Sequence, residues 1–118
     1  MNWSGLAAAS ATFLGVWLGH VAVRRIEFVS VRLWPPALSL VLLGLALEAG
    51  SLASAYQPLS ILLGILGVTV LWDALELARQ AKRVRRGHAP ANPANARHAQ
   101  ILKDFPAATT VDLLKKPD

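Results

Sequence analysis

The sequence predicts an all-α fold: an integral membrane bundle of three helices, with the third helix extended into the cytoplasm and an irregular C-terminal tail. Composition is the first reason, since 54% of the 118 residues are hydrophobic and 16% are charged, against about 25% charged in a soluble domain. Charge placement is the second. The first 23 residues contain no Lys, Arg, Asp or Glu, and residues 33–72 contain only Glu48. We therefore expect a transmembrane domain over residues 1–86 and a cytoplasmic tail over 87–118.

The first span is expected over residues 3–23. This run is uncharged and mainly apolar, and at about 1.5 Å per helical residue it is roughly 30 Å long, which matches the hydrocarbon core of a bilayer. A signal peptide carries its positive charge before the apolar run, whereas Arg24 and Arg25 follow this one, so we expect it to be retained. Residues 26–33 are interpreted as a short bent segment at the membrane interface.

The second and third spans each begin beside proline, which is tolerated best in the first turn of a helix. The second is expected over residues 35–54 and the third over 58–78. Strong helix formers continue the third helix beyond the membrane to about residue 86. Gly87 is the first breaker and fits a C-terminal cap.

Basic residues predict the orientation of these spans. They gather after the first and third spans, whereas the connection between the second and third has no Lys or Arg. The positive-inside rule then gives an external N-terminus and a cytoplasmic C-terminus. The residues expected at the membrane surface are Arg24, Arg25, Arg79, Lys82, Arg85 and Arg86. Because they adjoin apolar spans, we relate the net charge of +5 to the lipid bilayer and not to nucleic acid.

The composition changes at Gly87 to Ala, Pro, Asn and scattered charge, which indicates an irregular linker. Further on, residues 99–105 and 109–114 can form short amphipathic turns that touch the membrane or a partner. A mobile tail is the equal alternative.

Small residues recur every fourth position along the first helix and also interrupt the third. In a membrane such strips let two helix backbones approach closely. The predicted helix-packing residues are Ala7, Ala11, Gly15, Gly19, Gly64 and Gly67. Packing within the chain is the favoured interpretation, and a dimer seam is the alternative.

Ionisable residues in or beside the spans are the candidate functional groups, because a charge at the bilayer centre costs about 3 kcal/mol. His20 lies near the cytoplasmic end of the first span and Glu48 near the external end of the second, so we expect no contact between them. Asp73 and Glu76 lie at the cytoplasmic boundary, where pairing with Arg24, Arg25 or Arg79 is the simplest explanation.

Cysteine is absent and the three histidines are widely spaced, so we expect no metal site. The sequence has no glycine-rich phosphate loop and no recognisable set of nucleophile, base and acid. We therefore expect no cofactor and no enzymatic activity.

Two stretches carry a family resemblance. The first comprises Asn2-Trp3, Gly5-Leu6, Thr12-Phe13-Leu14, Gly19-His20 and Glu27; the second comprises Leu71-Trp72-Asp73-Ala74-Leu75-Glu76-Leu77 with Gln80, Arg83-Val84, Gly87, Pro90 and Asn92-Pro93. Together they resemble a family of small bacterial membrane proteins known as domain of unknown function 4491, over residues 2–93. The resemblance implies three spans in a bacterial inner (plasma) membrane and no known activity. It makes the tail after Asn95 an extension.

The resemblance and the topology together give the sharpest functional hypothesis, a cluster of His20, Glu27, Glu76 and Arg83 at the cytoplasmic face. The full set of candidate functional polar residues is His20, Glu27, Glu48, Asp73, Glu76, Gln80 and Arg83.

We expect the protein to be an accessory or scaffold subunit that packs with partner membrane proteins. The alternative is an oligomeric small transporter or channel that uses its intramembrane ionisable residues. A third possibility is that residues 79–86 sense anionic lipid. An accessory subunit predicts co-purifying membrane proteins, whereas a channel predicts a homo-oligomer that conducts ions.

Overall fold

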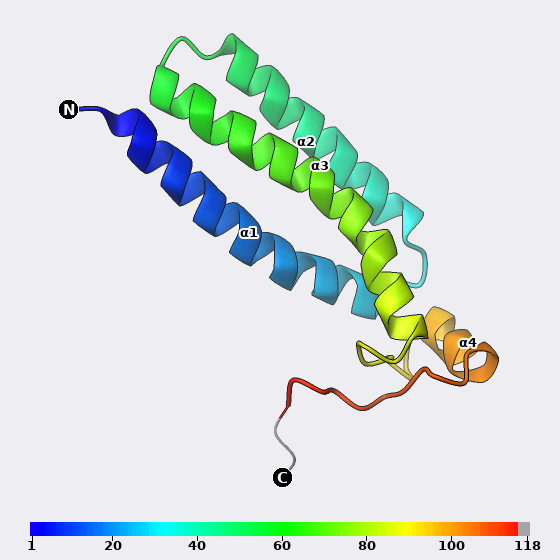
Figure 1. Ribbon diagram of the computed structural model, residues 1–118. Helices are drawn as coiled ribbons and strands as arrows, with labels where there is room; N and C mark the ends of the chain where they lie inside the picture. The colour runs from blue at the N-terminus through cyan, green and yellow to red at the C-terminus, as the bar shows by residue number, and fades with distance from the viewer. Residues whose placement is uncertain (116–118) are drawn as a thin grey trace.

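The computed structural model describes residues 1–115, which form four helices (Figure 1). In chain order these are α1 (Trp3–Val29), α2 (Trp34–Ala53), α3 (Gln57–Arg85) and α4 (Ala96–Asp104). Residues 116–118 of the expected tail lie outside the described residues. The all-α fold class is confirmed.

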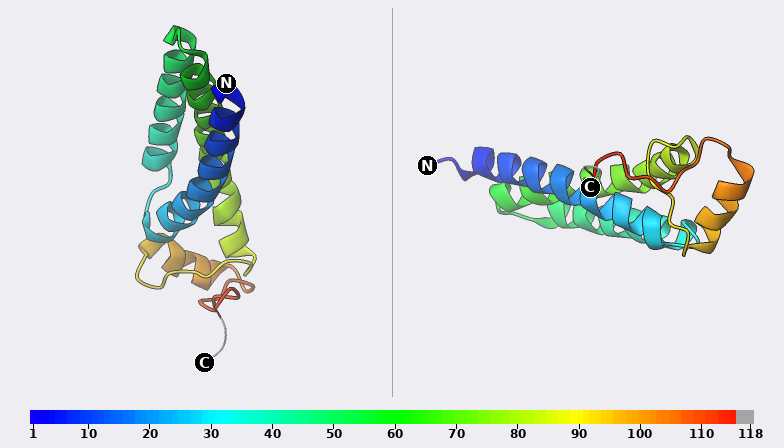
Figure 2. Two further views of the ribbon diagram at one scale, coloured as in Figure 1. Left: turned by 90° about the vertical axis from the view of Figure 1, so that its left-hand side faces the viewer. Right: turned by 90° about the horizontal axis from the view of Figure 1, so that it is seen from below.

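The helix at the centre of the bundle is α3. Both α1 and α2 pack along it, so the three long helices lie side by side with α3 in the middle (Figure 1 and Figure 2). The molecule measures 55 × 32 × 18 Å along its principal axes, and a single helix with its side chains is about 10–12 Å across. The bundle is therefore a thin layer, with α4 and the rest of the tail at one end.

All three long helices are long and apolar enough to cross a membrane. Large apolar side chains remain exposed along each of them: Phe13 is 71% exposed on α1, Leu42 59% on α2 and Val68 61% on α3. Continuous apolar surface of this kind is rare on monomeric soluble proteins. The fold is compatible with a multi-pass membrane protein.

Helix α1 is longer than the expected span, because it continues to Val29. The expected bent segment is therefore wrong for residues 26–29, and only residues 30–33 connect α1 to α2. No glycine or proline occurs between Gly19 and Ser30, and the backbone N–H of Ser30 still donates to the Ile26 carbonyl at 2.9 Å. The last turn also receives hydrogen bonds from the tail, which are described below.

Gly87 ends α3 with φ +76°, a conformation that favours glycine. The Gly87 N–H donates to the Val84 carbonyl and the His88 N–H to the Arg83 carbonyl, at 3.1 and 2.9 Å, which is the Schellman arrangement. A Cβ at Gly87 would also collide with the Ala107 carbonyl oxygen. Gly87 therefore terminates α3 as expected. Because it has no side chain, it also leaves room for the tail, which passes beside it at Ala107.

The tail beyond Gly87 is folded over the end of α3; we call its described part, residues 87–115, the cap. Its helix α4 begins three residues before the expected amphipathic turn, with the Asn95 side chain accepting from the Arg97 N–H at 2.9 Å. The expected turn at 109–114 forms no helix. A small apolar core joins the cap to α3; its buried members are Val84, Ala89, Ala91 and Ile101.

Glycine makes the α2–α3 contact possible. A Cβ at Gly44 would lie 2.6 Å from Cγ of Leu71 and 3.0 Å from the Gly67 carbonyl oxygen, whereas a Cβ at Gly5 would meet nothing within 4 Å. We predict that Gly44→Ala lowers the free energy of unfolding by about 1–3 kcal/mol through overpacking, and that the matched Gly5→Ala does not. Denaturant unfolding in detergent, followed by circular dichroism, measures both. Equal stability of the two variants would contradict the close contact.

Candidate functional site

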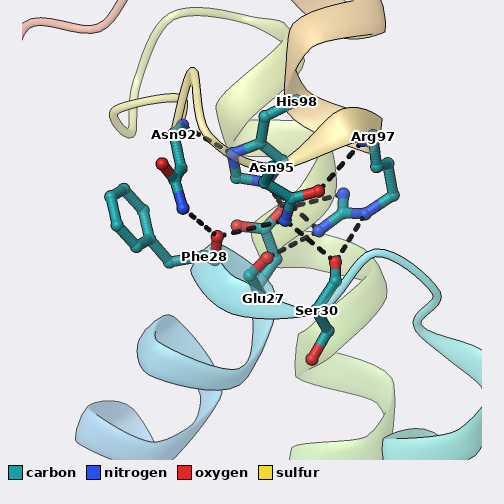
Figure 3. Close-up of polar contacts among 7 residues, drawn as sticks. All are labelled: Glu27, Phe28, Ser30, Asn92, Asn95, Arg97 and His98. Carbon is teal, nitrogen blue, oxygen red and sulfur yellow. Dashed lines mark hydrogen bonds and ion pairs between the residues drawn. The ribbon is translucent and has the colours of Figure 1, made fainter.

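A buried ion-pair network joins the end of α1 to the start of α4 (Figure 3). The Glu27 side chain is 1% exposed, and its Oε1 atom lies 2.9 Å from Nη1 of Arg97 and 2.9 Å from Nε2 of His98. The His98 side chain is fully buried and meets the Phe28 ring edge-on at 6.1 Å between centroids. A carboxylate from one end of the sequence and two basic groups from the other therefore share one buried site.

The same segment of the cap completes the carboxyl end of α1. The last carbonyls of a helix have no partner within the helix and carry partial negative charge. Arg97 Nη2 donates to the Glu27 carbonyl at 2.6 Å. The Phe28 carbonyl accepts from the amides of Asn92 and Asn95, each at 3.1 Å, and Asn95 also donates to the Ser30 carbonyl at 3.0 Å. Residues of the tail thus supply the hydrogen-bond donors that the carboxyl end of α1 lacks within the helix.

The hydrogen bonds of His98 define its tautomer. The backbone N–H of Asn92 donates to Nδ1 at 2.7 Å, so Nδ1 is the acceptor and Nε2 carries the proton that is donated to Glu27. Arg97 Nη2 lies 3.1 Å from Nε2, but both are donors and meet only because they share Glu27. Since both ring nitrogens of His98 are engaged in a buried site, the Glu27–His98 pair joins the cap to α1.

A second polar group runs along the exposed end of α3. Glu76 pairs with Arg79 at 3.0 Å and with Arg83 at 3.2 Å, and Arg83 also donates to the Gln80 side chain at 2.6 Å. The Arg79 guanidinium lies over the Trp72 ring, 4.8 Å from its centroid. Glu76 therefore has the arginine partner on its own helix that was expected.

Gln80 and Arg83 line two cavities. The helix cavity, of about 580 Å³, is lined by α1 and α3 alone and includes His20, Asp73 and Glu76. The tail cavity, of about 630 Å³, is lined by α1, α3 and the cap. Arg24, Gln80 and Arg83 line both.

The predicted four-residue cluster forms in part. His20, Glu76 and Arg83 line the helix cavity together. Glu27 lines the tail cavity instead, and its carboxylate is occupied by two residues that the sequence analysis did not select. Asn95 is a favourable helix N-cap residue, and this signal could have predicted that the helix begins at Ala96. Because the sequence analysis expected the amphipathic turn to begin at residue 99, it left Arg97 and His98 in the linker.

The small-residue strip of α1 faces α3. Ala11, Gly15 and Gly19 are buried, and Ala7 is half-buried. A Cβ at Gly19 would lie 2.8 Å from both carboxylate oxygens of Asp73, so that side chain lies directly against the α1 backbone. Within residues 1–115 no basic side chain pairs with Asp73, so the expected pairing with an arginine is wrong for this residue.

Glu48 lies apart from these groups, against the glycines of α3. A Cβ at Gly67 would be 2.5 Å from its Oε1 atom, and one at Gly64 would be 4.0 Å from its Oε2 atom. Oε1 is buried and has no hydrogen-bond partner among the described residues. The other expected surface residues, Lys82, Arg85 and Arg86, are exposed, and Arg85 lies 5.8 Å from the centroid of the Phe105 ring.

The comparisons with known proteins identify a family and supply no activity. The model of the family described as Domain of unknown function (DUF4491) matches residues 2–95. The chain belongs to this family. No curated protein and no solved structure matches the chain. Within residues 1–115, no group of three or more His, Asp or Glu side chains is placed to hold a metal ion.

The family match confirms the resemblance found in the sequence. It includes some residues of the buried ion-pair network and leaves out others. Glu27, Asn92 and Asn95 lie inside the matched region, and Arg97 and His98 follow its last residue. The two basic partners of Glu27 therefore come from the segment that extends beyond the match.

We predict that Arg97→Gln loosens the cap, because it removes the cation beside a buried carboxylate and a donor to the α1 carbonyls. The matched change is Arg79→Gln, at an ion pair whose arginine is 52% exposed and which contributes little. Hydrogen exchange followed by mass spectrometry should show at least tenfold faster exchange over residues 98–105 in Arg97→Gln and unchanged exchange in Arg79→Gln. Unchanged exchange in both would mean that the network does not hold the cap.

Proposed function

We propose that this chain is a multi-pass protein of a bacterial inner membrane, with an external N-terminus and a cytoplasmic cap. Three long helices with exposed apolar side chains support the embedding. Arg24 and Arg25 at the end of α1, and the basic end of α3, lie at the end of the bundle that carries the cap, and the positive-inside rule assigns that end to the cytoplasm.

Single cysteines test this orientation directly, because the natural chain has none. Ala55, in the connection between α2 and α3, and Lys103, in the cap, are both exposed. We predict that a membrane-impermeant maleimide labels Ala55→Cys in intact cells, and labels Lys103→Cys only after the membrane is permeabilised. The reverse pattern would invert the topology, and equal labelling in intact cells would contradict the embedding.

We further propose that the protein has no catalytic role and works as an accessory or scaffold subunit that presents the cap to partner membrane proteins. The observation that carries this proposal is the buried Glu27–Arg97–His98 network. Buried ion pairs contribute little net stability because both charges lose their hydration, but they can specify one geometry. Here they fix the position of the cap relative to the helices, as a presented surface requires.

The outer surface of the cap adds a second argument. Phe105 is 39% exposed and Val111 59% exposed, although neither belongs to a membrane-length helix. The Arg85 guanidinium lies over the Phe105 ring, 5.8 Å from its centroid. Exposed apolar side chains beside basic ones are typical of a protein contact surface.

Purification in native nanodiscs tests the accessory role. We predict that the tagged protein retains a stoichiometric foreign membrane subunit, that Arg97→Gln loses most of it, and that Arg79→Gln keeps it. Intact-particle mass spectrometry measures the stoichiometry. A particle made of this chain alone would contradict the proposal, and so would a subunit retained equally by both variants.

Glu48 favours a second candidate function, an oligomeric transporter or channel. Its buried Oε1 atom lacks a hydrogen-bond donor among residues 1–115, and an ionisable group in a span is otherwise costly. A homo-oligomer in the same experiment, with proton flux in liposomes that falls in Glu48→Gln and not in Asp104→Asn, would support this function.

A further inference from the structure

The tail cavity brings together three parts of the chain that are distant in sequence. Arg24 and Arg25 come from the last turns of α1, Gln80 and Arg83 from the end of α3, and His88 from the cap. Its volume is about 630 Å³, which is within the range of ligand-binding pockets. The cavity exists only because the cap folds back over the two helices.

In the part of the chain that the structure describes, two of the three arginines in this cavity have no ion-pair partner, whereas Arg83 is paired with Glu76. Among residues 1–115, neither Arg24 nor Arg25 has a carboxylate within 4.0 Å. Of the two acidic residues in the wall, Glu27 is occupied by Arg97 and His98. The other, Asp112, accepts a hydrogen bond from the Leu114 N–H at 3.0 Å and keeps its negative charge, so the two unpaired arginines leave the cavity with an excess of positive charge.

One of the arginines is positioned in advance. Gln80 is buried, and its side-chain oxygen accepts from Arg83 Nη1 at 2.6 Å while Glu76 holds Arg83 Nη2 at 3.2 Å. A guanidinium fixed in this way loses less conformational entropy when it binds an anion. Three guanidinium groups facing one space suit a phosphate group, whose several oxygens accept from such donors.

The remaining wall is apolar. Val21 is 46% exposed and Leu114 is 81% exposed, and Phe28 and Leu113 also line the cavity. A small free anion gains no favourable contact with these apolar side chains, whereas an acyl chain would pack against them. If α1 enters the membrane at Trp3, the hydrocarbon core of about 30 Å ends near residue 23, which puts Arg24 and Arg25 at the depth of the lipid headgroups.

We propose that the tail cavity binds the phosphate group of an anionic phospholipid, with Arg24, Arg25 and Arg83 contacting the phosphate and Val21 and Leu114 contacting the acyl chain. The phosphate chemistry would also serve a free phosphorylated ligand, and the experiment distinguishes the two sources. The lipid source rests on the membrane placement proposed above. Unlike a general attraction of basic residues to the membrane surface, this site requires particular arginines.

The test uses the full chain in detergent micelles and measures bound lipid by native mass spectrometry. Phosphatidylglycerol should bind at least tenfold more tightly than phosphatidylcholine. Arg25→Gln should weaken phosphatidylglycerol binding about fivefold, while Arg25→Lys keeps most of it. Lys82→Gln is the matched control, because Lys82 is exposed on α3 and lines neither cavity. Arg24→Gln is the second variant if Arg25→Gln fails to fold.

Three results would overturn the site: equal binding of the two lipids, equal loss in Arg25→Gln and Lys82→Gln, or no loss in either variant. Displacement of phosphatidylglycerol by millimolar inorganic phosphate would overturn the lipid as the source and assign the site to a free phosphorylated ligand. Carbonate extraction of membranes measures separately whether the chain is embedded in the bilayer, so failure of the lipid site can be distinguished from failure of the proposed membrane placement. A variant that stays embedded but loses the lipid bears on the cavity alone, whereas a wild-type chain that is extracted refutes the embedding.

Discussion

The carboxyl end of α1 depends on groups that lie far along the chain. Glu27 and His98 are separated by 71 positions in the sequence, yet their contact is buried and shared with Arg97. The donors that satisfy the last carbonyls of α1 come from the same short segment. A helix end without partners would need water, so the arrangement couples the length of α1 to the folding of the cap.

This coupling organises one end of the molecule. With the cap attached at α1, its later residues return past Gly87 and close the tail cavity over Arg83. The ion pair with Glu76 and the hydrogen bond to Gln80 set the direction of the Arg83 side chain. The candidate site is therefore the junction of α1, α3 and the cap, and no single helix contains it.

Elsewhere the bundle follows from local rules. Three long apolar helices, with prolines in the first turns of α2 and α3 and a glycine cap on α3, were predictable because each depends on neighbours in the sequence. The packing of Gly15 and Gly19 against α3 agrees with the predicted small-residue strip. The sequence pattern alone left open whether that strip packs against another helix of this chain or against a second copy.

Hydropathy, helix formers and residue spacing along one element are enough to predict the fold class, the approximate bounds of the three apolar helices, the family resemblance and the local Glu76–Arg79 pair. The partners of Glu27 are apparent from the three-dimensional structure alone, because hydropathy does not report which distant side chains complete a helix end. The packing of the chain identifies Arg97 and His98 as these partners. It also decided that the tail is a folded cap. Its helix has nine residues, too few to be stable alone in water, and it depends on contacts with α1 and α3 that no local pattern encodes.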